Sequence, residues 1–149
     1  MQHVKATARS KANREAVWRV VADAESWDSW GAWRVAELER EGTPPPGGVG
    51  AIKVITSEAR GLTGRPVVSR EEVTEYDPPS RFGYKLLSGL PVRDYNASIT
   101  LSDAPDGGTE ITWQSQFEGK APLVGGLLRR ALQRFMEDAV KRLAREAER

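Results

Sequence analysis

The chain has 149 residues, which is a common size for one domain and is enough to enclose a core, with or without a cavity. Its 22 Lys and Arg residues against 21 Asp and Glu residues leave a net charge of +1, which argues against a protein that binds nucleic acid by neutralising phosphates. The lack of cysteine excludes disulfides and thiol chemistry, and the lack of a signal-like or long apolar run predicts one cytoplasmic domain over 1–149 without stable membrane insertion.

The N-terminal part of the chain predicts one strand and two short helices. Residues 3–10 alternate apolar and polar side chains, which is typical of a half-buried strand. Asn13 precedes a narrow apolar stripe and is suited to cap a helix over about 14–22. The stretch DAESWDSW, residues 23–30, indicates a second short helix, with Asp23 as its cap.

The middle of the chain predicts six strands joined by short turns. The segments with strand-like patterns are 33–40, 49–59, 67–77, 81–88, 93–102 and 109–118. Their separators, such as GTPPPGG, DPPS and DAPDGG, are rich in the residues that tight turns require. Strands joined by connections this short pair as antiparallel neighbours, because a parallel crossover needs about a dozen residues. We therefore predict an antiparallel meander.

The C-terminal segment, 121–149, changes to a helical period. Apolar side chains recur there at spacings of three and four residues, at Leu123, Leu127, Leu128, Ala131, Leu132, Phe135, Met136, Ala139 and Leu143. They predict one amphipathic helix whose apolar face extends over about six turns. Such a basic helix can also bind a membrane or a partner, but the domain would have no core without it. We therefore predict an α+β fold in which a curved antiparallel sheet grips the helix.

Two of the strands predict a cavity. One face of 109–118 carries Ile111, Trp113, Ser115 and Phe117, and one face of 93–102 carries Arg93, Tyr95, Ala97, Ile99 and Leu101. A tightly filled core favours Leu, Ile and Val throughout. Large rings beside small or polar residues suit instead a pocket for an amphipathic ligand. An ordinary core between sheet and helix is the alternative.

Strand 67–77 has two phases that the pattern does not distinguish. One phase turns Val68, Arg70, Glu72, Thr74 and Tyr76 inward, and the other turns Val67, Ser69, Glu71 and Val73 inward. As neighbouring carboxylates, Glu71 and Glu72 fit a solvated surface better than an acid–base pair, because a chain with 21 acids produces such pairs by chance.

The stretch ESWDSWGAW, residues 25–33, holds three of the five tryptophans of the chain. Acidic residues interleave the rings and no apolar run surrounds them, which argues against a membrane anchor. Trp33 enters the predicted strand 33–40 and is a candidate for the wall of the pocket.

Metal and cofactor chemistry has few ligands to draw on in this chain. His3 is the single histidine and lies at the start of the first predicted strand. With one histidine and no cysteine, a catalytic triad or a histidine-ligated metal site is implausible. We expect no metal and no cofactor.

Five segments, spread over nearly the whole length of the chain, together resemble a known protein family. They are AVWRVVADAESWDSW, GGVGA, EVTEYDPPSRFGYKL, GGTEITWQSQFE and the terminal amphipathic helix. In their order and spacing they resemble the polyketide cyclase/dehydrase and lipid-transport group of the START-like (SRPBCC) superfamily. The resemblance implies a helix-grip fold, in which a seven-stranded antiparallel sheet wraps around the last helix, with two short helices after the first strand that close one end. It also implies a deep hydrophobic cavity, used in similar proteins by aromatase/cyclases or for binding lipids, hormones or pigments.

The resemblance further implies roles for single residues. Trp30 matches a tryptophan that closes the short-helix end, and Trp27 lies where similar proteins contact the cavity. In aromatase/cyclases a serine and an arginine on the strand before the DPPSR-like turn are implicated in catalysis. By spacing from that turn, the matching positions are Glu72 and Thr74, so the chain departs from the cyclase pattern.

Our first hypothesis is a protein that binds a hydrophobic or aromatic small molecule, lipid- or polyketide-like. We expect the cavity wall to include Trp27, Trp33, Tyr84, Arg93, Tyr95, Ile99, Trp113, Phe117, Leu132 and Phe135. Arg93, with Arg70 and Glu72 if they face inward, would fix a polar group of the ligand by charge-assisted hydrogen bonds. We expect a monomer or a homodimer with no nucleic-acid partner.

The second hypothesis is an enzyme, a cyclase, aromatase or dehydratase that acts on a carbonyl chain in the same cavity. Tyr95 or Tyr84 would then act as the acid and Glu72 as the base. Arg70 or Arg93 would stabilise an enolate. A third class is a structural or interaction module, which would have a filled core and an exposed apolar patch.

Overall fold

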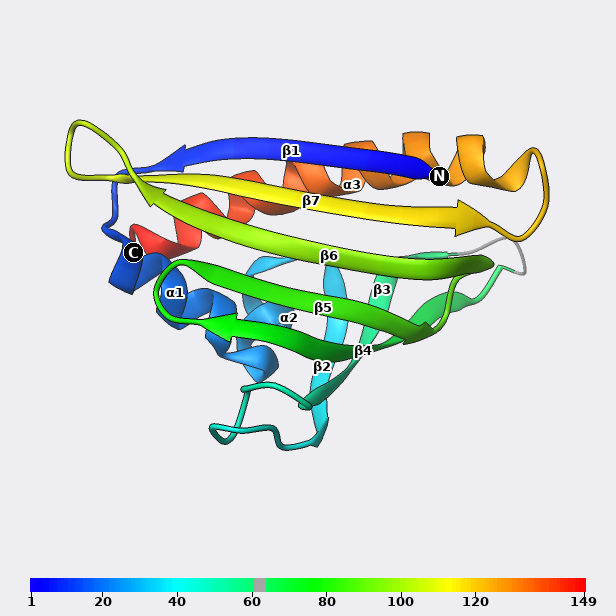
Figure 1. The fold of residues 1–149 in the computed structure, drawn as a ribbon, viewed down its shortest axis with the longest axis horizontal. Helices are drawn as coiled ribbons and strands as arrows, with labels where there is room; N and C mark the ends of the chain where they lie inside the picture. The colour runs from blue at the N-terminus through cyan, green and yellow to red at the C-terminus, as the bar shows by residue number, and fades with distance from the viewer. Residues whose placement is uncertain (61–63) are drawn as a thin grey trace.

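The computed structural model describes residues 1–60 and 64–149, and Figure 1 shows how the elements are arranged. They are, in chain order, β1 (Gln2–Ser10), α1 (Arg14–Ala22), the 3₁₀ helix η1 (Ala24–Ser26), α2 (Trp27–Trp30), β2 (Trp33–Arg40), β3 (Ile52–Arg60), β4 (Pro66–Asp77), β5 (Arg81–Ser88), β6 (Val92–Asp103), β7 (Thr109–Gly119) and α3 (Val124–Ala147). The predicted order of strands and helices is confirmed.

In the described part of the chain, seven strands form one antiparallel sheet in the order β1-β7-β6-β5-β4-β3-β2. From β2 to β7 each strand pairs with the next one in the chain, and β1 pairs with β7 at the other edge. Figure 1 shows β2 and β3 running across the direction of the longer strands, so that the sheet curves, while α3 follows β1 and β7. The predicted meander that grips a C-terminal helix is therefore confirmed.

The helix α1 begins where its sequence predicts. The Asn13 side chain accepts a hydrogen bond from the Ala16 amide at 3.0 Å, which satisfies one of the backbone donors that a helix start leaves unpaired. On the other side of the helix, Val17 and Val21 are buried against the core. The cap sets where α1 starts, and the apolar stripe sets which face it turns inward.

The capping role predicted for Asp23 is wrong, because the Asp23 side chain makes no capping hydrogen bond. Its backbone carbonyl accepts instead from the Ser26 amide at 3.1 Å and from the Ser26 hydroxyl at 2.8 Å. These bonds form the single 3₁₀ turn η1, which joins α1 to α2 and turns the tryptophan-rich segment toward the sheet.

The C-terminal two thirds of α3 supply the helical side of the core. The buried side chains of this part are Met136, Ala139, Val140, Leu143 and Ala144, each no more than 4% exposed. They recur at spacings of three and four residues and face the sheet, as the amphipathic pattern predicts.

The first turns of α3 differ from the prediction. Leu123 and Leu127 are 82% and 68% exposed, so the apolar face does not contact the core over its whole length. Figure 1 shows that these turns extend past the start of β1. Among the described residues, no helix has both the length and the apolar composition that crossing a bilayer requires.

We expect the two parts of α3 to respond differently to truncation of a leucine. Leu143 is 0% exposed, so Leu143→Ala is expected to lower the free energy of unfolding by about 2–5 kcal/mol. Leu127→Ala, the matched control on the same helix, is expected to change it by less than about 0.5 kcal/mol. Urea denaturation followed by circular dichroism measures both, and equal losses would contradict the assigned orientation of the helix.

Candidate functional site

A cavity of about 260 Å³ lies between the inner face of the sheet and α3. Its lining comes from α2, from β2 to β7 and from α3, and consists of Trp27, Trp33, Ile55, Ser57, Arg60, Val67, Ser69, Glu71, Tyr84, Leu86, Leu90, Tyr95, Trp113, Leu128, Ala131, Leu132, Phe135 and Met136. A larger hollow of about 530 Å³ lies over β1 and β4 to β7, but its lining is mainly polar. The apolar, aromatic lining makes the inner cavity the candidate site.

The three clustered tryptophans divide into two groups. Trp27 and Trp33 line the cavity with ring centroids 5.2 Å apart, whereas Trp30 does not line it. Trp30 packs behind them, 5.3 Å from Trp27 and 5.5 Å from Trp33. The Trp27 indole N–H donates to the Val21 carbonyl at 3.1 Å, which fixes the orientation of its ring. The structure thus puts Trp27 and Trp33 in the cavity lining and Trp30 outside it.

Five other expected wall residues also lie at the cavity, and two do not. The five are Tyr84, Tyr95, Trp113, Leu132 and Phe135. Ile99 and Phe117 are fully buried but lie outside the lining, so the expectation that they form the wall is wrong. Phe117 stacks on Tyr95 with centroids 5.7 Å apart, and it is Tyr95 that lines the cavity. Ile99 lies between its cross-strand neighbours Phe82 and Trp113, in the filled part of the core.

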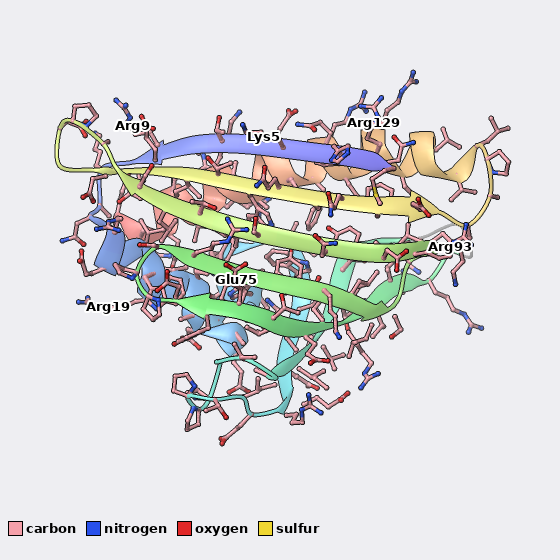
Figure 2. All side chains as sticks on the ribbon, viewed as in Figure 1. Lys5, Arg9, Arg19, Glu75, Arg93 and Arg129 are labelled. Carbon is pink, nitrogen blue, oxygen red and sulfur yellow. The ribbon has the colours of Figure 1, made fainter. Side chains whose placement is uncertain are left out.

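Arg93 points away from the cavity, contrary to the prediction that it anchors a ligand. The pairing of β6 with β7 is regular from Asn96 to Asp103, but the register shifts between Arg93 and Asn96. Within this bulge Asp94 has a φ of 53°. The bulge reverses the alternation, so that Val92 is buried and Arg93 is exposed. Figure 2 shows Arg93 at the end of the sheet opposite the short helices.

The outer face of the sheet carries the other two charged residues that were expected to act in the cavity. Arg70 forms two hydrogen bonds with Glu39, at 2.9 and 2.6 Å. Glu72 lies 3.8 Å from Arg40 and 3.9 Å from Lys85. None of these side chains lines the cavity, so the catalytic roles predicted for Arg70 and Glu72 are wrong.

The structure selects the second phase for the first part of β4. Val67, Ser69 and Glu71 line the cavity. Thr74, which matches a catalytic position of aromatase/cyclases by spacing, is exposed. The register of β4 against β5 shifts between Val73 and Glu75, so the inward and outward faces of β4 do not alternate regularly along its whole length. The expectation that Glu71 lies on a solvated surface is therefore wrong.

A buried pair of opposite charges, which the sequence analysis missed, adjoins the cavity. Lys53 on β3 and Glu71 on β4 lie directly opposite each other in the strand register and are 5% and 8% exposed. The Lys53 Nζ is 3.8 Å from the Glu71 Oε1. The same ammonium lies 2.9 Å from the centroid of the Trp27 ring, where the negative face of the indole attracts a cation.

Burial shifts the protonation of both partners. It lowers the pKa of Lys53 to about 8, although the Glu71 carboxylate acts in the opposite direction. Burial likewise raises the pKa of Glu71, and the Lys53 ammonium opposes that shift. Each group therefore loses part of its preference for the charged form, because the surrounding aromatic rings replace water.

Several hydroxyl groups lie beside this pair. The Trp113 indole N–H donates to the Tyr84 hydroxyl at 3.1 Å, and the Tyr95 hydroxyl lies near those of Tyr84 and Ser115. The Ser115 hydroxyl donates to the Met136 sulfur at 3.6 Å. Burial, reinforced by the charge of Glu71, raises the pKa of Tyr95 to about 12, so this phenol is neutral at physiological pH.

Two buried polar atoms lack a hydrogen bond in the described part of the chain. Among the described residues, the buried side-chain nitrogens and oxygens without a partner are the Trp30 Nε1 and the Glu71 Oε1. Of these two residues, Glu71 lines the cavity. Within residues 1–60 and 64–149, no group of three or more carboxylate or histidine side chains could hold a metal ion.

The Lys53–Glu71 pair had no clear signal in the sequence. In AIKVIT, residues 51–56, the strand face with Ile52 and Val54 is more apolar than the face with Lys53. The alternation therefore suggests that Lys53 faces solvent. The pair becomes visible only when position 53 is aligned with position 71, and that register depends on the whole β3–β4 hairpin. Opposite charges on neighbouring predicted strands are the one signal that could have suggested it.

An antiparallel sheet wrapped around a long C-terminal helix, with two short helices after the first strand, defines a helix-grip fold. The sequence profile described as polyketide cyclase / dehydrase and lipid transport matches residues 1–148. The chain therefore belongs to this family. A comparison with curated proteins found no match.

Solved structures share the fold at low sequence identity. A START superfamily protein from Mycobacterium smegmatis superposes with a TM-score of 0.82 and 15% identity, over 99% of this chain and 98% of that one. The Zhui aromatase/cyclase from Streptomyces sp. R1128 has a TM-score of 0.81 and 19% identity, over 99% and 94%. The di-domain aromatase/cyclase StfQ of the steffimycin biosynthetic pathway has a TM-score of 0.78 and 12% identity, over 98% of this chain and 50% of that one.

We expect the buried pair to make stability depend on pH once its cation is removed. In Lys53→Met the Glu71 carboxylate has no counter-charge, so its folded pKa lies above its unfolded value of 4.5. The folded state then keeps a proton that the unfolded state has lost above pH 4.5, so stability falls as the pH rises beyond that value. At pH 7 the expected loss is about 3–5 kcal/mol, and at pH 5 it is smaller.

Urea denaturation at both pH values measures this effect. The double variant Lys53→Met/Glu71→Leu, which removes both charges, is expected to recover the stability of the original protein or exceed it. Lys85→Met, which removes an exposed partner of Glu72, is the control and is expected to cost less than about 1 kcal/mol. A single variant as stable as the double variant at pH 7 would contradict the coupling.

Proposed function

We propose that the protein binds one small hydrophobic or aromatic molecule in the cavity between the sheet and α3. The observation that carries the proposal is a cavity of about 260 Å³ with aromatic walls between the sheet and α3. Sites for small molecules have this character, with mostly apolar walls and a few convergent polar groups. Membership of a family described by polyketide cyclisation and lipid transport supports it.

The arrangement of the rings favours a flat ligand. Trp33 and Phe135 meet edge to face with centroids 5.5 Å apart, and both line the cavity. Trp27 and Trp113 line it as well, 5.6 Å apart and nearly perpendicular. Aromatic rings of a ligand gain offset or edge-to-face contacts with such walls in addition to the burial of apolar surface.

The volume favours a compact ligand. Typical small-molecule sites enclose roughly 300–1,000 Å³, and this cavity of about 260 Å³ is slightly smaller than that range. A molecule of two or three rings suits such a space better than a long lipid chain. The unfilled volume also argues against the third class, an interaction module with a filled core.

Cyclisation of a carbonyl chain is the second candidate function. Two neighbours in structure are named aromatase/cyclases, and Tyr95 lines the cavity as a buried, neutral phenol. However, Arg70, Glu72 and Arg93, the other residues predicted for this chemistry, lie outside the cavity. Ligand binding requires none of the three, and for this reason we propose it first.

A variant that fills the cavity tests the proposal. Leu132 lines the cavity, so Leu132→Trp is expected to weaken binding of the fluorescent probe Prodan, a neutral naphthalene derivative, by at least about tenfold. Leu127→Trp places the same ring on the exposed face of α3 and is expected to leave binding unchanged. Probe titration measures both, and native mass spectrometry of protein from its own host would detect a natural ligand. Failure of the original protein to bind the probe saturably would contradict the proposal.

A further inference from the structure

Among the described residues of the cavity wall, Glu71 carries a buried oxygen that accepts no hydrogen bond. This oxygen is Oε1, and its ionic partner is the Lys53 ammonium at 3.8 Å. The neighbouring Tyr84 hydroxyl differs, because it already accepts a hydrogen bond from the Trp113 indole N–H at 3.1 Å. A buried acceptor without a donor is costly, and a donor supplied by a ligand would remove that cost.

Lys53 does not supply that donor. Its Nζ is 3.8 Å from the Glu71 Oε1, which is longer than a hydrogen bond, and it is held over the ring of Trp27 at 2.9 Å. Lys53 lines a separate void of about 10 Å³ and not the main cavity, whereas Glu71 lines both. The cation therefore balances the charge of Glu71 from behind the wall, and the carboxylate is the member of the pair that meets the cavity.

This arrangement selects the charge of the ligand. An anionic ligand would place its charge beside the Glu71 carboxylate. The cation that the structure places in the lining, Arg60, is exposed, donates to the Gly64 carbonyl at 2.6 Å and forms no ion pair with Glu71. A cationic ligand would meet Glu71 with Lys53 already 3.8 Å from it. A neutral hydroxyl donor avoids both repulsions, and its bond to a carboxylate is stronger than a bond between neutral groups.

We infer that the ligand is a compact, neutral ring compound with a phenol or alcohol hydroxyl, and that this hydroxyl donates a hydrogen bond to Glu71 while the rings pack against Trp27, Trp33 and Phe135. This inference rests on the proposed function, because it names the ligand class of the same cavity. It assigns to Glu71 the anchoring role that the sequence suggested for Arg93 and Glu72.

Competition against Prodan separates the inference from the proposed function, since Prodan is neutral and has no hydrogen-bond donor. We expect 2-naphthol to displace the probe at a concentration about 10- to 100-fold lower than 2-methoxynaphthalene, which has the same rings without the donor. The anion 2-naphthoate and the cation 2-naphthylmethylammonium are both expected to compete less well than 2-naphthol.

Two variants locate the effect. Lys53→Met/Glu71→Leu is expected to reduce the preference for 2-naphthol over 2-methoxynaphthalene to less than about threefold, a ratio measured within the variant whatever its own affinity for Prodan. Glu71→Gln keeps the shape and an acceptor but not the charge, and is expected to show an intermediate preference. Glu72→Gln, the matched control one position along β4 on the outer face, is expected to keep the full preference.

The outcomes are distinguishable. If the original protein binds Prodan but shows no preference for the hydroxyl, or if the preference persists in the folded double variant, the role of Glu71 is overturned and ligand binding stands. If the original protein does not bind Prodan, the proposed function fails and this inference fails with it. Thermal unfolding of each variant confirms that it is folded before the competition is measured.

Discussion

The packing of Trp27 is the contact on which the rest of the interior depends. Its ring is 1% exposed and meets the rings of Trp30, Trp33, Phe82 and Trp113. Its N–H holds the end of α1 through the Val21 carbonyl, and its face supports the Lys53 ammonium. One side chain thus joins the short helices to the sheet, forms part of the cavity wall and stabilises a buried charge.

Two features of the interior lower stability compared with a filled apolar core. An internal cavity forfeits packing contacts, and a buried ion pair such as Lys53–Glu71 loses more hydration than its attraction restores in many proteins. They occur next to each other, with Glu71 common to both. The proposed ligand would account for the two together, because a molecule in the cavity would restore the contacts and supply the missing donor.

The helices and strands could be predicted because their signals are local. The Asn13 cap, the Pro- and Gly-rich turns and the periodicity of α3 each lie within a few neighbouring residues. Short connections between strands then implied the antiparallel meander, and the aromatic content of β6 and β7 indicated a cavity. Seven of the ten residues expected in the wall line the cavity, among them Trp27, Trp33 and Trp113.

The errors occur where alternation along a strand is interrupted. A bulge around Asp94 turns Arg93 outward, and the phase of β4 turns Arg70 and Glu72 outward and Glu71 inward. The sequence alone determines the helices and strands, their order and the aromatic character of the site. The charged groups that reach the cavity follow from strand register and bulges, because a shift of one residue exchanges the two faces of a strand, and that register is set by pairing with distant segments of the chain.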